Sequence, residues 1–346
     1  MSDVYLRKWK LVIGFNGEVN SQVVVASPKE YPERRKEDGG LILYKERYKT
    51  AGPITNLVTT PPVTIEVSSP LQLSAEIEDK KTTEKSTTAA NKAKIRIYNL
   101  DEDVSDRIKI GWSVFLYAGY EQDLDLPLVF VGQATVVRVT KEGADIVTII
   151  EADAADLVRH GAKISKSYPP DSDLKHIIDD LASNIAKSGI PIGEINTQAN
   201  AQELLKKAYP NGYNIHGGLI QALEAVCDAN AMRAYVSKGK LYIEPKQLNG
   251  QLTNVVNVGI DNFKGTLDKK RISHGKPKTA ESDSEDKSDD LDLTLYLDGR
   301  INLNSIARLT IPGYEGDYEI KSIRLDLDYE GDSWDTKLKI SPIIHK

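Results

Sequence analysis

The sequence predicts a mainly β protein with a small α+β domain in its middle. Three observations lead to this fold class. Many segments of the 346-residue chain alternate apolar and polar residues with a period of two, the pattern of strands buried on one face. Turn-forming residues separate these segments at short intervals. Two stretches in the middle of the chain instead repeat apolar residues at helical spacing.

Residues 1–155 are predicted to form a first block of strands. β-branched and aromatic residues are frequent there, and they favour a pleated surface. Short strands with turns between them indicate a barrel or a sandwich. The expected strands are residues 4–14, 19–26, 63–67, 71–78, 94–100, 112–120, 127–140 and 145–152.

Three long polar segments lie between expected strands. Residues 27–40 are rich in charge and proline, and residues 79–91 are rich in threonine, so both are expected on the surface. Residues 273–290 carry acidic side chains through their second half, with a single lysine among them. Like charges repel and nothing apolar anchors this segment, so we expect disorder or an exposed loop. A functional acidic segment is the alternative.

Residues 156–245 are predicted to form the small α+β domain. A first helix is expected over residues 171–189, with Asp171 or Ser172 capping its start and Gly189 ending it. A second helix is expected over residues 217–230. The apolar positions at helical spacing are Leu174, Ile177, Ile178, Leu181 and Ile185 in the first helix and Leu219, Leu223, Val226 and Cys227 in the second.

A hairpin over residues 232–245 is expected to complete this domain. Its two apolar runs are separated by Lys238-Gly239, and a glycine in a two-residue turn is typical of a tight hairpin. Alternating segments then return over residues 246–346. The sequence therefore predicts a second block of strands after the middle domain, interrupted by the charged segment 273–290.

The stretch from Asp326 to Lys337 tests this interpretation, because its acidic residues alternate as in a helix–loop–helix calcium site. The twelfth position is Lys337, where such a site needs a bidentate glutamate. The flanking residues alternate with a period of two, which indicates strands rather than helices. We therefore predict a hairpin turning at Glu330-Gly331-Asp332, with Gly331 at positive φ. A calcium loop is the alternative.

Composition narrows the possible functions. A net charge of −6 argues against a general surface for binding nucleic acid. Cys227 is the only cysteine, which excludes intrachain disulfides and cysteine-based zinc cages. No apolar run is long enough to span a bilayer, and the N-terminus lacks the pattern of a signal peptide. We therefore expect a protein that is made and folds in a cytoplasm.

No catalytic, cofactor-binding or metal-binding residues are predicted, and no cofactor is expected. Phosphate-loop, dinucleotide-binding and nucleophile-elbow motifs are missing from the sequence, and its five histidines form no zinc-hydrolase pair. His176 is expected to be a partly exposed helical residue. Acidic residues in 101–103, 123–125 and 179–180 leave a carbohydrate-active enzyme as an alternative, because a glycosidase needs only two carboxylates. Acids beside strands are, however, usually solvated turn residues.

Several segments together resemble the baseplate hub proteins of tailed phages. Residues 95–158 contain "YNL", a "GWSVFLYAGY" strand, an apolar strand ending in glycine and an acidic "EADAAD" stretch. Residues 299–340 resemble the C-terminal barrel of the same family, most specifically in "GYEGDYEIKSIRLDLDYEGDSW". The middle helices and the segment "MRAYVSKGKLYIEP" follow in the usual order of parts. The chain is therefore predicted to be a hub protein, with the alternating blocks explained by the family's fold.

The resemblance implies two tail-tube-like β-barrel domains, residues 1–155 and 246–346, around the α+β domain of residues 156–245. It implies a homotrimer whose six barrels form a pseudo-sixfold ring. That ring would adapt the tail tube to a threefold central spike, within the baseplate of the virion. The other implied partners are a tube initiator or distal tube ring, the tape-measure protein and baseplate wedge proteins. DNA would pass through the lumen without specific binding.

The sequence departs from the family's pattern in the long segments 27–49 and 273–290, which leaves the exact barrel boundaries open. No lysozyme or peptidase module follows the last strands, so digestion of a cell wall would belong to a partner. The hub of a tailocin or of a secretion-type contractile injection system has the same mechanics and stays an alternative. A carbohydrate-active enzyme or glycan-binding module is the third possibility. We expect a structural protein rather than an enzyme.

Overall fold

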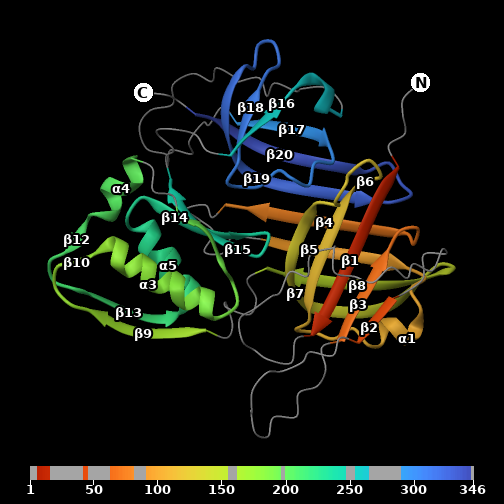
Figure 1. Ribbon diagram of the computed structural model, residues 1–346, viewed down its shortest axis with the longest axis horizontal. Coiled ribbons are helices and arrows are strands. Elements are labelled where there is room, and N and C mark those ends of the chain that lie inside the picture. The colour runs from red at the N-terminus through yellow and green to blue at the C-terminus, as the bar shows by residue number, and fades with distance from the viewer. Residues whose placement is uncertain are drawn as a thin grey trace, which may run out of the picture.

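The computed structural model describes residues 6–15, 42–45, 63–81, 91–154, 162–195, 199–246, 254–264 and 290–343. The mainly β class predicted from the sequence is confirmed, and the predicted helices lie in the middle of the chain (Figure 1). The expected strand at residues 19–26 and the polar segment 27–40 lie outside the described residues. So do most of the segments 79–91 and 273–290.

Thirteen strands of the described residues share one hydrogen-bonded sheet. Along the sheet they follow the order β16-β18-β19-β4-β5-β8-β7-β6-β1-β3-β2, while β20 pairs with β19 and β17 pairs with β20. The first strands are β1 (Arg7–Phe15), β2 (Ile42–Lys45), β3 (Val63–Ser68), β4 (Leu73–Lys80), β5 (Asn91–Tyr98), β6 (Ser113–Tyr120), β7 (Leu128–Glu142) and β8 (Asp145–Asp153). The last are β16 (Val255–Val258), β17 (Leu291–Tyr296), β18 (Ile306–Leu309), β19 (Gly316–Asp328) and β20 (Trp334–Pro342), and a short helix α1 (Glu102–Ser105) follows β5.

Strand β7 bends, so that its two halves pair with different strands and connect two layers of the first block. Its first part pairs with β6 and its second part with β8, and Gln133 pairs with both neighbours. A register shift between Ala134 and Val136 marks a bulge at this bend. A Cβ on Gly132 would lie 2.6 Å from the ring of Phe130 and 2.9 Å from the backbone of Asp153. The bend folds β1, β3 and β6 across β7 and β8, as Figure 1 shows.

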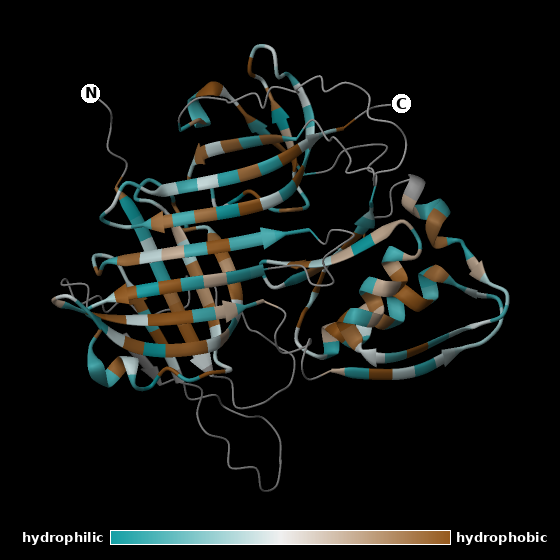
Figure 2. Cartoon of the chain, turned by 180° about the vertical axis from the view of Figure 1, so that it is seen from behind, coloured by the Kyte–Doolittle hydropathy of each residue, from teal (hydrophilic) through white to brown (hydrophobic). Residues whose placement is uncertain are grey.

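A large hydrophobic core lies between these layers and continues into the last block of strands. Alternate residues of β4 and β5 are buried, the period-two pattern expected from the sequence. Figure 2 shows the same alternation of hydrophobic and hydrophilic residues along many strands. The largest fully buried side chains include Trp9, Phe130 and Leu116. Strands from both ends of the chain therefore share one core.

Strand β19 connects the first and last blocks of strands. One edge of β19 pairs with β20. The other edge pairs with β18 through residues 316–319 and with β4 through residues 322–328. We call the antiparallel pairing of residues 322–328 with residues 74–80 the β4–β19 seam. The seam makes the two blocks neighbours in one continuous sheet.

Two further contacts connect the segment around β16 to the other strands of the last block. β16 lies parallel to β18. After β16, the short 3-10 helix η2 (Ile260–Asn262) leads to Phe263, which forms an isolated bridge with Leu295 of β17. Two tail-tube-like barrels, and domain boundaries at residues 155 and 245, nevertheless remain predictions.

The acidic stretch after β19 is a hairpin, as predicted. Asp326 forms ion pairs with Arg324 at 2.7 Å and Lys337 at 2.6 Å, and the Asp328 carboxylate accepts a hydrogen bond from the Gly331 amide at 2.9 Å. The prediction of positive φ at Gly331 is wrong. A Cβ at this position would lie 2.3 Å from Asp328 Oδ2, so any other residue there would require the Asp328 side chain to shift.

The middle of the chain builds a separate α+β unit, which we call the middle unit (described residues 162–246). It contains helices α3 (Leu174–Lys187), α4 (Ala199–Leu205) and α5 (Leu219–Asp228). Strands β14 (Met232–Ser237) and β15 (Lys240–Pro245) form the predicted hairpin, and β11 (Ile192–Ile195) pairs with β15 in parallel. Two further pairs complete it, β9 (Lys163–Tyr168) with β13 (Tyr213–Gly218) and β10 (Ser172–Asp173) with β12 (Ala208–Tyr209).

The apolar faces predicted for the two helices are buried in a second core. The predicted capping by Asp171 or Ser172 is wrong, because α3 begins only at Leu174. Asp173 takes the capping position and makes no side-chain capping bond. The tight turn of the β14–β15 hairpin is as predicted, with positive φ at both Lys238 (45°) and Gly239 (73°).

Candidate functional site: a buried polar junction

The β14–β15 hairpin is buried on both faces. Every residue of β14 is buried. Ala234 and Val236 point into the core of α3 and α5, while Tyr235 belongs to the core of the large sheet. Successive side chains of a strand point to opposite faces, so β14 necessarily presents its alternate residues to two different bodies. The hairpin is therefore the element that joins the middle unit to the sheet.

Polar side chains gather where this hairpin meets the sheet. From the hairpin come Arg233, Tyr235, Ser237, Lys238 and Glu244, and from the sheet come Asp79, Lys81, Asn91, Glu319 and Lys321. We call these ten residues the polar junction. Lys81 directly follows β4 and Glu319 lies on β19, so the junction contacts strands from both blocks.

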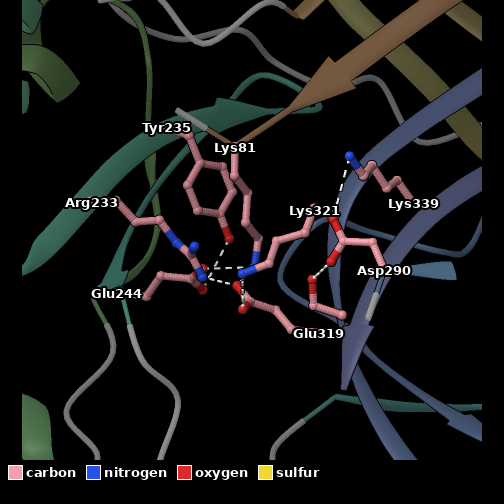
Figure 3. Close-up of polar contacts among 9 residues, drawn as sticks. Lys81, Arg233, Tyr235, Glu244, Asp290, Glu319, Lys321 and Lys339 are labelled. Carbon is pink, nitrogen blue, oxygen red and sulfur yellow. Dashed lines mark hydrogen bonds and ion pairs between the residues drawn. The ribbon is translucent and has the colours of Figure 1, made fainter. Parts of the chain in front are cut away.

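The centre of the polar junction is a network of buried ion pairs (Figure 3). The Lys81 ammonium lies 2.7 Å from Glu244 Oε1 and 3.1 Å from Glu319 Oε1. Arg233 donates from Nε to Glu244 Oε1 at 2.8 Å and also pairs with Glu319. All four side chains are at most 8% exposed. Each carboxylate therefore bridges two cations that come from different parts of the fold.

Two further groups extend the network. The Tyr235 hydroxyl donates to Glu244 Oε2 at 3.1 Å. Lys321 donates to Glu319 Oε2 at 2.5 Å and is the most exposed cation of the network. Beyond Lys321, Figure 3 shows Asp290, which pairs with Lys339 at 3.3 Å. The network thus runs from the hairpin to the surface of the last block.

A second group of contacts surrounds the tip of the hairpin. The Ser237 hydroxyl donates to Asp79 Oδ2, and Asn91 Nδ2 donates to the Val236 carbonyl at 3.0 Å. Lys238 Nζ donates to the carbonyls of Gly299 at 2.5 Å and Ile301 at 3.0 Å. The tip therefore contacts the first block through Asp79 and Asn91 and the last block through Lys238.

Glycine at the tip allows a close approach. A Cβ on Gly239 would lie 2.8 Å from Val131 of β7. The same residue has a φ of 73°, which side-chain-bearing residues rarely adopt. Both the turn and the contact with β7 thus require glycine at this position.

Burial dominates the electrostatics of the polar junction. It raises the pKa of Asp79 to about 7, although the Ser237 hydroxyl and two nearby lysines favour the ionised form. Burial likewise lowers the pKa of Lys81 to about 7, against the opposing effect of Glu244. The pKa values of Lys238 and Lys321 are lowered to about 8, again mainly by burial. The docked hairpin therefore disfavours the charged form of all four groups.

Glu244 behaves differently. Burial raises its pKa, but Lys81 and Arg233 more than offset this effect, so the pKa of Glu244 falls below its ordinary value. Asp79 has no such pair of cations in contact, and within the described residues its Oδ1 has no hydrogen-bond partner. An unpaired buried carboxylate oxygen is costly. The junction therefore combines a well-paired centre with one poorly satisfied group near its tip.

The structure does not bring the acidic alternatives of the sequence into one site. Asp101 caps α1 by accepting from the Asp103 amide at 2.9 Å, and Asp123 accepts from the Tyr120 amide at 2.8 Å. Asp179 pairs with Lys175 on the surface of α3. These roles are local, as expected for acids beside strands and on helices.

His176 lies on α3, with its ring edge against Tyr168 at a centroid distance of 5.9 Å. Nearby, Asp180 accepts hydrogen bonds from the Tyr168 hydroxyl at 2.6 Å and from Lys166 at 2.7 Å. In the described part of the chain, no three His, Cys, Asp or Glu side chains gather as metal ligands. Across the same ranges, no helix is long and apolar enough to cross a bilayer.

Sequence reasoning missed the polar junction. One feature could have drawn attention to it: Arg233 and Glu244 are charged residues in the two otherwise mostly apolar arms of a hairpin, and they stand opposite each other. Lys81 and Glu319 carry no comparable feature, since charged residues at strand ends are common. Their partnership spans 238 positions of the chain.

Fold and comparisons together define the class of protein. The 43 kDa tail protein of prophage MuSo2 from Shewanella oneidensis is similar over 79% of this chain and 97% of its own length, with 14% identity and a TM-score of 0.50. A tail protein from Neisseria meningitidis MC58 is similar over 78% and 95% of the two chains, with 12% identity and a TM-score of 0.49. The first likeness supports a tail-protein fold.

Residues 85–258 match the family model described as baseplate hub gp41, which is just over half of the chain. The chain belongs to this baseplate hub family, and so to the structural proteins of phage tails. The E. coli c3393 protein, described as a type VI secretion component similar to T4 tail proteins gp27 and gp5, matches 79% of this chain and 74% of its own, with 7% identity and a TM-score of 0.49. No curated protein sequence matches the chain.

Proposed function

We propose that this protein is the structural hub of a phage tail baseplate, in which three copies form a pseudo-sixfold ring that joins the tail tube to the central spike. The proposal is supported by family membership together with one structural observation, the β4–β19 seam. Through the seam, each chain presents two blocks of strands side by side in one sheet. Three such chains would supply six blocks, which is the number that a sixfold tube requires.

The partners follow from this arrangement. One side of the ring would bind the tube initiator or distal tube ring, and the opposite side would bind the spike. Wedge proteins of the baseplate would contact the outer surface. Tape-measure protein and DNA would pass through the lumen, and a net charge of −6 is compatible with DNA passing without specific binding. The role is structural, without catalysis by this chain.

Copy number in assembled tails tests the proposal. Cryo-electron microscopy of purified particles should place three copies in a ring between tube and spike, each contributing its two strand blocks. Mass photometry of the isolated protein should give a species of about 115 kDa, three times the 38.3 kDa of one chain. Six copies in the ring, or a position outside the tube axis, would contradict it.

A further inference from the structure

The middle unit and the large sheet have separate hydrophobic cores. Helices α3 and α5 pack against each other and against one face of the β14–β15 hairpin. The core of the sheet lies between strands of the first and last blocks. Apart from the rings of Tyr235 and Tyr242, which pack in the core of the sheet, each body can therefore keep its own apolar packing without the other.

Polar contacts connect the described parts of these two bodies. They include the contacts of the polar junction and an outlying hydrogen bond from Asn304 to Glu194 at 3.3 Å. Polar groups regain hydrogen bonds to water when they separate, so such an interface costs less to open than an apolar one. Buried ion pairs add little to the free-energy cost of opening the interface, because desolvation offsets most of their attraction.

In the described part of the chain, apolar contact across the interface comes from one face and the tip of the hairpin. Tyr235 is buried in the core of the sheet, and Tyr242 packs against that core beside it, with the two rings stacked 5.6 Å apart. At the tip, the backbone of Gly239 meets Val131. Two tyrosine rings and one tip contact make a small patch compared with either core.

We propose that the polar junction is a latch, and that the middle unit separates from the sheet as an intact body while both cores stay folded. This inference goes beyond the role as a hub and does not require the ring. It gives the subunit a second arrangement, in which the junction face of the hairpin is exposed to solvent.

The electrostatics support this inference. Asp79 faces Ser237 and Lys238 from the hairpin and Lys81 from its own segment, with the rings of Tyr235 and Tyr242 nearby. The raised pKa of Asp79 and the lowered pKa values of Lys81 and Lys238 share one cause, which is burial. Opening the junction returns these groups to water and removes that penalty.

A thiol at the junction would report its opening. Ser237 is 1% exposed and contacts Asp79, so a Ser237→Cys thiol is shielded while the hairpin is docked. Cys227, the only natural cysteine, is fully buried in the core of the middle unit and becomes reactive only when that core opens. A Ser105→Cys variant supplies a matched control in the first block, where Ser105 is 4% exposed.

The rates of alkylation at the three positions are measured by peptide mass spectrometry on the full-length variants, after near-native circular dichroism has been verified. If the latch opens, position 237 is modified at least about tenfold faster than Cys227 and position 105. Adding Glu319→Gln should raise the rate at position 237 by a further factor of about ten and leave Cys227 unchanged. Equal rates at positions 237 and 227 in both backgrounds would overturn the proposal, because the hairpin would then open only when the middle unit unfolds.

Amine labelling of the natural sequence gives a second measurement that needs no substitution. Lys81, whose side chain is 3% exposed, is shielded in the docked state and becomes accessible when the junction opens. It should be acylated while Cys227 still resists alkylation. Protection of Lys81 that is lost only together with protection of Cys227 would likewise contradict the latch.

Discussion

The two connections that hold this molecule together differ in kind. At the β4–β19 seam, backbone groups of two strands pair and their inward side chains, among them Ile77 and Leu325, enter the common core. At the polar junction, charged side chains meet across a buried interface and the backbones of the two bodies do not pair in one ladder. The seam thus depends on strand geometry and apolar burial, whereas the junction depends on a few individual side chains.

This difference has a functional consequence for a hub. The proposed ring between tube and spike needs its strand blocks fixed relative to each other, and a continuous sheet with one core would provide that. Among the described residues, the strands of the middle unit share no ladder with the large sheet, so this unit is not fixed in the same way. A polar attachment lets it be held in place and still be released, which backbone pairing within a shared core would not permit.

The largest effect is expected from Glu319→Ala. This change removes the carboxylate that contacts Lys81, Arg233 and Lys321, and leaves the buried Lys81 and Arg233 to share the single carboxylate of Glu244. Breaking a buried ion pair from one side costs about 3–5 kcal/mol. Chemical denaturation should therefore show a large loss of stability, concentrated in the attachment of the middle unit. Arg324→Ala, on the exposed face of the same strand, should change stability by less than about 0.5 kcal/mol.

If Glu319→Ala were no more harmful than Arg324→Ala, the network would be dispensable and the contrast between the two connections would be lost.

A slightly smaller effect is expected from Leu325→Ala at the seam. Leu325 is 3% exposed in the core shared by both blocks, and truncating such a leucine costs about 2–4 kcal/mol. Its loss should lower the cooperative unfolding transition of the whole sheet, monitored through the fluorescence of the buried Trp9 and Trp334. The alkylation rate at Ser237→Cys should stay unchanged under native conditions. A variant that released the middle unit selectively would show that seam and junction are not independent.

The smallest effect is expected from Asp79→Asn, and its sign depends on pH. Because the folded-state pKa of Asp79 is raised to about 7, its contribution to stability is fully present below its ordinary pKa of 3.8 and is lost as the pH rises to about 7. Asparagine keeps an acceptor for the Ser237 hydroxyl and does not titrate. The free energy of unfolding of the variant, relative to that of the natural protein, should therefore rise by at least about 1 kcal/mol between pH 5 and pH 7.5.

Thermal unfolding at the two pH values measures this gain, with the exposed Asp125→Asn as a matched control. Comparing each variant with the natural protein at the same pH cancels the titration of Lys81. A constant difference between Asp79→Asn and the natural protein at both pH values would mean that Asp79 is not held in its protonated form.

Local chemistry explains why much of the fold could be predicted. The alternation in residues 94–100 determines which side chains of β5 face a core, whatever strands it pairs with. Helical spacing in α3 and α5 is similarly local. Lys238-Gly239 specifies a turn because glycine tolerates positive φ, and the short connection fixes the pairing of β14 with β15. These features need no information from distant parts of the chain.

Where local rules competed with their surroundings, prediction from sequence was less successful. Asp171 or Ser172 was expected to cap α3, yet β10 extends through Asp173 and the helix begins only at Leu174, so Asp173 takes the capping position. Gly331 was expected to provide positive φ, yet its φ is not positive and its amide donates a hydrogen bond to the Asp328 carboxylate. In both cases the residue type indicated a cap or a turn, but neighbouring residues determined the role that the residue takes.

The sequence by itself determined the two blocks of strands, the two apolar helix faces and the tight hairpin, because each depends on residues close together in the chain. Only the tertiary structure decided that β4 pairs with β19 and that Lys81 meets Glu319 and Glu244. Every strand edge presents the same backbone donors and acceptors, so no residue marks its distant partner. A charged side chain likewise carries no sign of whether water or a buried opposite charge will face it, and that choice was made by packing the middle unit against the sheet.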